Sequence, residues 1–173
     1  MNSKTQLVVI VLVLLVMSSA QTDKQQLWQE YVFPADGFAV TLPASPHLRR
    51  DPQAADVSLY QLELSPGVLF AIHAGTRSRC SEVINRFKLT VRKNESGEFV
   101  AGSLKDISLM GNPGVEYGSH LKTGRDAFER LYCASDKAYS LTIGYPAGET
   151  KPAMADRIFN SFRFLKAAAS RRE

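Results

Sequence analysis

VEYGSHLKTGRDAFERLYCASDKAYSLTIGY, residues 115–145, decides the fold of this chain. Three segments within it are rich in the aromatic and branched side chains that favour strands. They are residues 115–121, 126–134 and 138–145. Short turn-forming stretches separate the segments, with Gly124 in the first and Ser135-Asp136 as the second. The pattern predicts a three-strand antiparallel meander.

Further strands are expected on both sides of the meander. Residues 38–42 and 68–74 alternate large apolar side chains with smaller or polar ones, which is the period of a half-buried strand. Other strands are expected at residues 29–33, 56–64, 103–110 and 162–165. Residues 43–55 contain three prolines and are expected to form a loop, and residues 111–114 a turn.

Two helices interrupt this series of strands. Between residues 80 and 93 the apolar side chains recur at helical spacing. A second helix is expected to open at residues 149–152, where a proline suits the first turn. Because the strands follow one another as hairpins, the sheet is expected to be antiparallel. The predicted fold class is α+β, with helices packed against an antiparallel β-sheet.

The start of the chain predicts export. Residues 7–17 form an unbroken apolar run of the kind found in secretory signal peptides, after Lys4 and before the small residues Ser18-Ser19-Ala20. As a helix the run would span about 16 Å, against roughly 30 Å of membrane hydrocarbon. We expect a signal peptide at 1–20, a flexible lead-in at 21–26, one domain at 27–166 and a frayed tail at 167–173, with no stable membrane span after cleavage.

Composition narrows the class of partner. Hydrophobic residues make up 45% of the chain and charged residues 22%, values typical of a globular protein. The formal net charge of +4 is mildly basic. For an exported protein this charge favours a protein or envelope component as partner over nucleic acid.

Cys80 and Cys133 leave two interpretations open. In an oxidising compartment they can bridge, which would close a loop of about fifty residues and add roughly 3–4 kcal/mol of stability. Two separate, buried thiols are the alternative. The spacing of the pair matches neither a redox Cys-x-x-Cys motif nor a zinc site.

His120 and Glu129 are the candidates for an acid–base pair. If the turn after residue 121 has two or four residues, His120 faces Ala127 and has Glu129 as its diagonal neighbour on the same face. A histidine beside a carboxylate can transfer protons near neutral pH. The alternative is a solvated or helix-covered polar face without chemistry.

Arg130 is a candidate anion-binding residue. The same register places it on an aromatic face with Tyr117, Phe128 and Tyr132. It either holds an anion at the edge of a pocket, or stacks on an aromatic ring and pairs with a carboxylate.

Common catalytic and cofactor motifs are missing from the sequence. It contains no G-x-S-x-G elbow, no phosphate-binding loop with its lysine, no H-E-x-x-H, no EF-hand loop and no G-x-G-x-x-G. We therefore expect no cofactor and no bound metal, and no motif argues for an enzyme.

Short motifs along the chain resemble a group of small exported bacterial proteins with the PsbP-like fold. They are GFAVTLP at 37–43, LMGNPGVEY at 109–117, RLY at 130–132 with YSL at 139–141, and FNSFRF at 159–164. The resemblance implies an antiparallel sheet between helices, an α/β/α sandwich. The fold is shared by a photosystem extrinsic subunit and a Ran-binding nuclear-import factor. Its members mostly act as binding or assembly modules, so the resemblance assigns no functional residue here.

The function we expect is a non-enzymatic binding or assembly module that is exported to the periplasm or secreted. Two alternatives remain. One is an envelope or extracellular hydrolase that uses His120 and Glu129. The other is a carrier of a small ligand, which a large apolar cavity would reveal.

Overall fold

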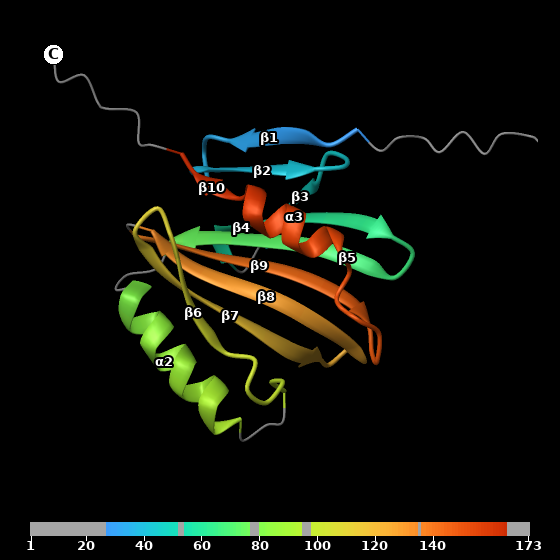
Figure 1. The fold of residues 1–173 in the computed structure, drawn as a ribbon. Coiled ribbons are helices and arrows are strands. Elements are labelled where there is room, and N and C mark those ends of the chain that lie inside the picture. Colours follow the sequence, from blue (N-terminus) through green and yellow to red (C-terminus); the bar gives the residue numbers. More distant parts are fainter. Residues whose placement is uncertain (1–26, 52–53, 77–79, 95–97, 135, 166–173) are drawn as a thin grey trace, which may run out of the picture.

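The computed structural model describes residues 27–51, 54–76, 80–94, 98–134 and 136–165. Two antiparallel sheets and two helices are built from these residues (Figure 1). The expected signal peptide, lead-in and tail lie outside the described residues and stay predictions.

The larger sheet has seven strands in the order β3-β4-β5-β9-β8-β7-β6. Their bounds are β3 (His47–Asp51), β4 (Ala54–Ser65), β5 (Val68–Thr76), β6 (Lys105–Leu109), β7 (Asn112–Leu121), β8 (Arg125–Ala134) and β9 (Lys137–Pro146). Every neighbouring pair is antiparallel, which confirms the predicted sheet type. The predicted meander is β7-β8-β9, and β9 then pairs with β5, so it joins the two halves of the sheet.

The smaller sheet has three strands in the order β1-β2-β10. They are β1 (Gln29–Phe33), β2 (Phe38–Leu42) and β10 (Arg163–Phe164). Asp36, in the turn between β1 and β2, fixes this sheet to the large one. Its carboxylate accepts a hydrogen bond from the Tyr60 hydroxyl at 2.5 Å, and its carbonyl accepts one from Tyr139 at 2.8 Å. Burial raises the pKa of Tyr139 to about 12.

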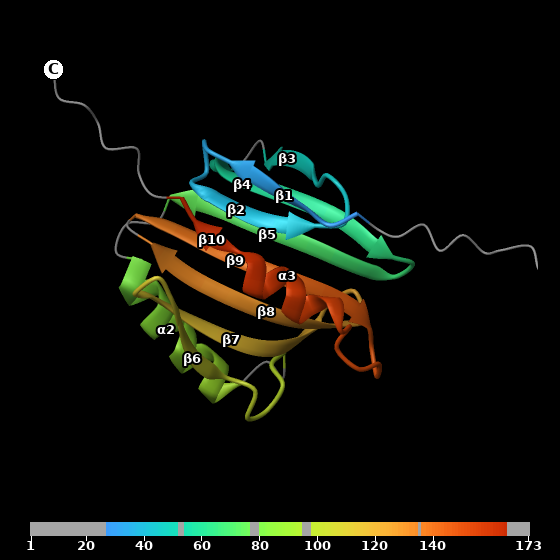
Figure 2. The same cartoon turned by 45° about the horizontal axis from the view of Figure 1, so that its top comes forward.

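The two helices lie on opposite faces of the large sheet. Helix α2 (Cys80–Lys93) has the predicted bounds and packs on β7 and β8. Helix α3 (Met154–Ser161) buries Ala155, Ile158 and Phe159 beside the small sheet. Figures 1 and 2 show the small sheet and α3 on one side of the large sheet and α2 on the other.

The main core fills the space between the large sheet, the small sheet and α3. The side chains that it removes from water completely include Phe38, Phe70, Leu141, Ile143 and Ile158. Ring contacts link it across elements, since Phe162 packs on Phe38 at 5.5 Å between ring centroids. A smaller cluster under α2 contains the two cysteines and Ile84.

Two local predictions were wrong. The proline-containing stretch at 43–55 was expected to be a loop, but it contains β3, an edge strand that pairs only with β4. The turn expected at 111–114 lies one residue earlier, where Met110 and Gly111 both have positive φ, at 52° and 78°. Two consecutive residues of this kind form the tight turn that suits a two-residue hairpin, so Asn112 already belongs to β7.

Candidate functional site

Cys80 and Cys133 form a disulfide in the structure. Their Cα atoms lie 5.5 Å apart, a normal separation for a bridge. Cys80 is the first residue of α2 and Cys133 lies near the end of β8. The bond therefore fixes the start of the helix to the sheet, beside the buried Ile84 and Val115.

His120 and Glu129 do not form the predicted pair. The loop between β7 and β8 is residues 122–124, and Gly124 has φ +72°. A loop of odd length moves the register by one residue, so His120 lies opposite Asp126 and Glu129 opposite Tyr117. Since side chains alternate along a strand, His120 and Glu129 point to opposite faces of the sheet. Tyr117 also lies on the α2 side of the sheet. The prediction that it shares a face with Phe128, Arg130 and Tyr132 was therefore wrong.

Glu129 is surrounded by hydroxyl groups. Its carboxylate accepts hydrogen bonds from Tyr117 at 3.1 Å, from Thr142 at 3.2 Å and from Ser119. Burial, and then the neighbouring carboxylate, raise the pKa of Tyr117 well above its usual value. A hollow of about 220 Å³ lies beside Glu129 and also touches His120. With three donors around it, Glu129 is held as a fixed hydrogen-bond acceptor.

His120 pairs with a different carboxylate on the other face. Its Nδ1 lies 2.7 Å from Oδ1 of Asp126, and Oδ2 of Asp126 accepts the backbone N–H of Gly148 at 3.0 Å. The N–H of Gly148, and then His120, lower the pKa of Asp126. The pair is solvent-exposed and joins the end of the β7–β8 hairpin to the loop before α3.

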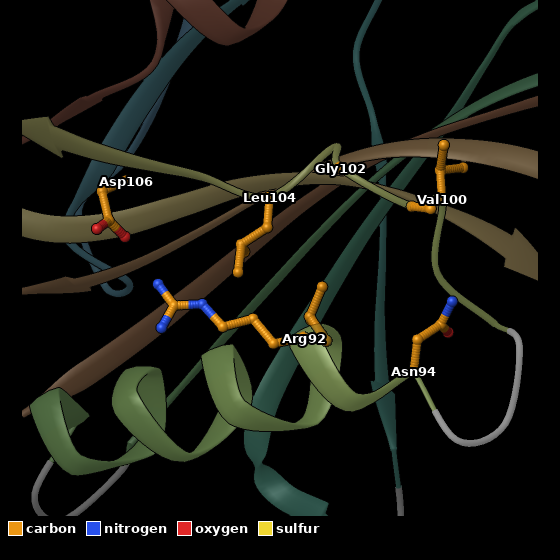
Figure 3. Close-up of a pocket in the computed structure, with 8 residues that line it drawn as sticks. Arg92, Asn94, Val100, Gly102, Leu104 and Asp106 are labelled. Atoms are coloured by element: carbon orange, nitrogen blue, oxygen red, sulfur yellow. The ribbon is translucent and has the colours of Figure 1, made fainter.

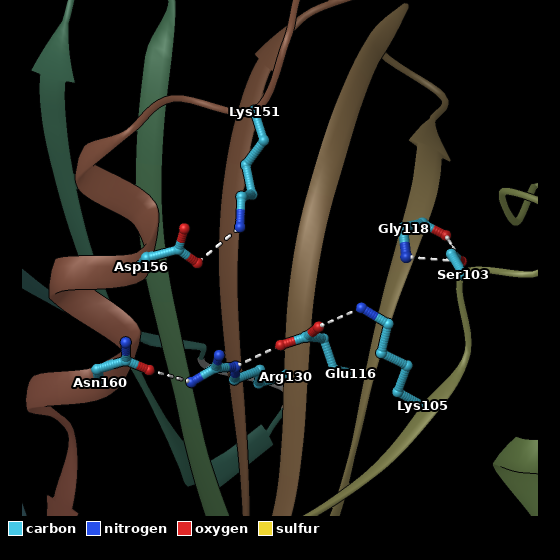
Figure 4. Close-up of polar contacts among 8 residues, drawn as sticks. All are labelled: Ser103, Lys105, Glu116, Gly118, Arg130, Lys151, Asp156 and Asn160. Atoms are coloured by element: carbon cyan, nitrogen blue, oxygen red, sulfur yellow. Dashed lines mark hydrogen bonds and ion pairs between the residues drawn. The ribbon is translucent and has the colours of Figure 1, made fainter.

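Arg130 ties β8 to α3. Its Nε donates to Glu116 at 2.9 Å, its Nη1 donates to Asn160 at 3.1 Å, and its guanidinium lies 5.3 Å from the ring centroid of Phe159. Lys105 adds a second cation 3.6 Å from Glu116 (Figure 4). The guanidinium of Arg130 is thus occupied by intramolecular partners. We therefore assign Arg130 a structural role and not the role of an anion-binding residue.

The α2 side of the large sheet is only partly covered. Helix α2 packs on β7 and β8, whereas on β5 the side chains that face this side, including Leu69 and His73, stay exposed. A hollow of about 680 Å³ lies on this uncovered part, between the β3 edge and the β7–β8 hairpin. We call it the open-face hollow and define it by six of its lining residues: His47, Arg49, Ala71, Arg125, Thr142 and Gly144.

The cross-strand register explains the shape of the open-face hollow. His47, Gln61, Ala71 and Thr142 form one row across β3, β4, β5 and β9. In the next row Leu69 lies opposite Gly144. Ala71 and Gly144 carry the smallest side chains of these rows, so they leave a shallow floor between the longer side chains on either side.

Arg125 is the residue that the sequence patterns did not single out. It lines the open-face hollow at the start of β8, and its Nη1 is buried. This atom has no hydrogen-bond partner among the described residues. Every other buried side-chain nitrogen and oxygen in the described ranges has a partner.

A second hollow, of about 360 Å³, lies between the end of α2 and the segment before β6 (Figure 3). Asn94 closes the helix end there, because its side chain both donates to and accepts from the backbone of Phe99, at 2.8 and 3.0 Å. Lys88 pairs with Asp106 at 2.6 Å across the same gap. These contacts hold α2 to the sheet, so we assign this hollow a structural origin.

Two general site types are absent from the described ranges. No three His, Cys, Asp or Glu side chains gather there closely enough to hold a metal ion. None of the helices in these ranges has the length and apolar character needed to cross a membrane.

Comparison with known proteins identifies the fold. The solution structure of cyanobacterial PsbP (CyanoP) from Synechocystis sp. PCC 6803 matches 86% of this chain and 99% of its own, with a TM-score of 0.54 and 13% identity. A crystal structure of a protein from Bacteroides thetaiotaomicron VPI-5482 matches 80% of this chain and 48% of its own, with a TM-score of 0.50 and 13% identity. No family model and no curated protein sequence matches the chain. The chain has a PsbP-like fold, as its motifs predicted, and identities this low show the fold alone.

Proposed function

We propose that this protein is an exported, non-enzymatic binding module and that the open-face hollow is its binding site for a small molecule. The proposal combines the expected binding or assembly role with the small-ligand alternative. The proposal includes the α/β/α sandwich arrangement. In that arrangement α2 covers only part of its face of the sheet, and the hollow stays accessible on the rest.

The observation that carries the proposal is the hollow itself. Its volume of about 680 Å³ falls within the range of roughly 300–1,000 Å³ that is usual for small-molecule sites. Its lining combines apolar side chains such as Leu69 and Leu121 with polar and charged ones such as Thr142 and Arg125. This mixture is typical of sites that bind the body of a ligand and orient it with a few hydrogen bonds.

An assembly role by strand addition has less support. The two edge strands of the large sheet are β3 and β6. Both carry charged side chains, with Arg49 and Arg50 on β3 and Lys105 and Asp106 on β6. Charges on an edge strand discourage pairing with a further strand.

The hydrolase alternative loses its acid–base pair. His120 bonds to Asp126 on one face, and Glu129 bonds to hydroxyls on the other. The hollow of about 220 Å³ touches both residues, but the two side chains bond to different partners and do not form an acid–base pair. We therefore do not propose this activity.

The experiment is a thermal-shift screen with matched neutral, cationic and anionic compounds. Ala71→Phe places a ring on the floor of the hollow, and Ala153→Phe, at an exposed position before α3, is the matched control. We expect at least one compound class to raise the Tm of the parent protein and of the control, but not of Ala71→Phe. If no class does so, the hollow is not the binding site.

Export is tested separately. Expression of the full chain in a bacterial host with a secretory pathway, followed by intact mass measurement of the exported fraction, is expected to show a protein that begins at Gln21. A product that keeps residues 1–20 and stays in the cytoplasm would contradict export.

A further inference from the structure

Arg125 and Arg130 are on the same strand, but only Arg130 is paired. The guanidinium of Arg130 is matched by Glu116 and Asn160. Nη1 of Arg125 is hidden from solvent and has no acceptor in the described part of the chain. An unpaired buried N–H of a charged group is unfavourable, and native proteins rarely keep one without a reason.

The charged side chains around Arg125 favour an anion as the ligand of the open-face hollow. Arg49 and His47 lie at the β3 rim of the same hollow, and Glu63 is its one carboxylate side chain. Within the described residues neither Arg49 nor Glu63 is part of an ion pair. The side chains that line the hollow carry a net positive charge, with two arginines against one glutamate, and the hydroxyl of Thr142 separates them from Glu129 through its hydrogen bond. A net positive lining raises the local concentration of anions.

The floor of the hollow favours an apolar body on that anion. Pro146 of β9 lies directly opposite Arg125, and Gly144 lies two residues before Pro146 on the same strand. Leu69 faces Gly144 from β5, and Ala71 follows in the next row. A ligand whose charged end reaches Arg125 can therefore lay an uncharged body over small and aliphatic side chains.

From these observations, and resting on the proposed function, we propose that the open-face hollow binds an organic anion with an apolar body. Its carboxylate or phosphate group accepts hydrogen bonds from Arg125. The planar guanidinium offers parallel N–H groups that match both types of oxyanion. Arg49 and His47 contribute favourable potential at the rim.

The test uses four eight-carbon probes: octanoate, octyl phosphate, octanol and octylammonium. They share a similar apolar chain and differ in the head group. Each is titrated into the purified protein at constant ionic strength, with binding followed by the amide NMR signals of Ala71, Thr142 and Gly144. We expect octanoate or octyl phosphate to shift these signals saturably, octanol to bind at least 10-fold more weakly, and octylammonium not to bind. The ratio between the two anions tells which oxyanion the site prefers.

Variants assign the effect to Arg125. Arg125→Gln is expected to weaken anion binding at least 10-fold and to leave octanol binding unchanged. Arg86→Gln, at an exposed position on α2, is the matched control and is expected to bind like the parent protein. The unfolding transition of each variant, followed by the fluorescence of Trp28, verifies that the protein is folded.

Three results would overturn the inference: equal binding of octanoate and octanol, an Arg125→Gln variant that binds anions normally, or no saturable shift with either anion. If neutral or cationic compounds bind in the thermal-shift screen and are blocked by Ala71→Phe, the proposed function stands and this inference alone fails. If no compound of any charge binds, both fail.

Discussion

The two arginines of β8 lie on opposite faces of the seven-stranded sheet and differ in their partners. On the face covered by α3 and the small sheet, Arg130 is enclosed by a carboxylate, an amide and an aromatic ring. On the partly covered face, Arg125 of the same strand keeps a buried nitrogen without a partner. Side chains of one strand alternate between the two faces of the sheet. Because of this, one arginine of β8 has a structural role and the other is available for binding.

The two faces also differ in how far their apolar side chains are buried. Phe162 is fully buried and packs against Phe38, Tyr132, Tyr139 and Phe164 on the covered face. On the open face, Leu69 remains 42% exposed. Most of the folding free energy is therefore expected to come from the covered face.

The largest expected effect is at the centre of the covered face. Phe162→Ala removes a ring from a close-packed cluster and is expected to lower the free energy of unfolding by roughly 3–5 kcal/mol. Leu69→Ala, on the open face, is expected to change it by less than about 0.5 kcal/mol. Urea denaturation of both variants makes the comparison. Similar losses for the two would mean that the faces do not divide stability in this way.

The disulfide gives the next effect. Replacing Cys80 and Cys133 together with alanine releases a bridge between residues 53 apart. The chain-entropy estimate for a loop of this size is about 4 kcal/mol, and measured losses usually fall at roughly 2–4 kcal/mol. In hydrogen exchange, the amides of α2 are expected to lose protection before those of α3. Equal loss in both helices would contradict a role confined to the α2 side.

The two arginines of β8 provide the most direct comparison. Arg130→Met leaves Glu116, which is 8% exposed, with only the more distant Lys105, and we expect a loss of about 2 kcal/mol. Arg125→Met removes an unpaired buried donor and is expected to be neutral or slightly stabilising. Chemical denaturation measures both changes. A loss of similar size at Arg125 would show that its guanidinium stabilises the fold, against the binding role.

The smallest expected effect concerns Asp126. Its folded pKa lies below the ordinary value of 3.8, so its contribution to stability is present above that value and is lost as pH falls through the folded pKa. The difference in stability between the parent protein and Asp126→Asn is therefore expected to shrink as the pH falls through the folded pKa of Asp126. A difference that does not change in acid would contradict the stabilisation of the Asp126 carboxylate by Gly148 and His120.

Most of the fold could be predicted because its signals are local. The helix at residues 80–93 has apolar side chains at helical spacing, and residues 38–42 alternate as a strand does, and both were placed correctly. Strand β3 was missed for the opposite reason. Its sequence, HLRRD, has no apolar alternation, and its extended shape comes from pairing with β4.

The candidate site was predicted less well because it depends on contacts between distant residues. One residue of loop length decided whether His120 could reach Glu129, and the sequence around Gly124 fits loops of two, three or four residues. The open-face hollow needs the strand order β3-β4-β5-β9-β8, which no local pattern contains. The missing hydrogen-bond partner of Arg125 likewise becomes evident only in the assembled sheet.

The loop at residues 122–124 is exposed, yet the pairing of the strands that it connects is fixed by the core. If β7 slipped by one residue along β8, Glu116 would point toward the disulfide and Tyr117 toward α3, so charged and aromatic contacts would be lost together. A residue inserted in the loop does not require such a slip, because the strands keep their partners while the loop lengthens. Such an insertion should therefore be tolerated, whereas a residue inserted within β7 or β8 should be as harmful as a core mutation.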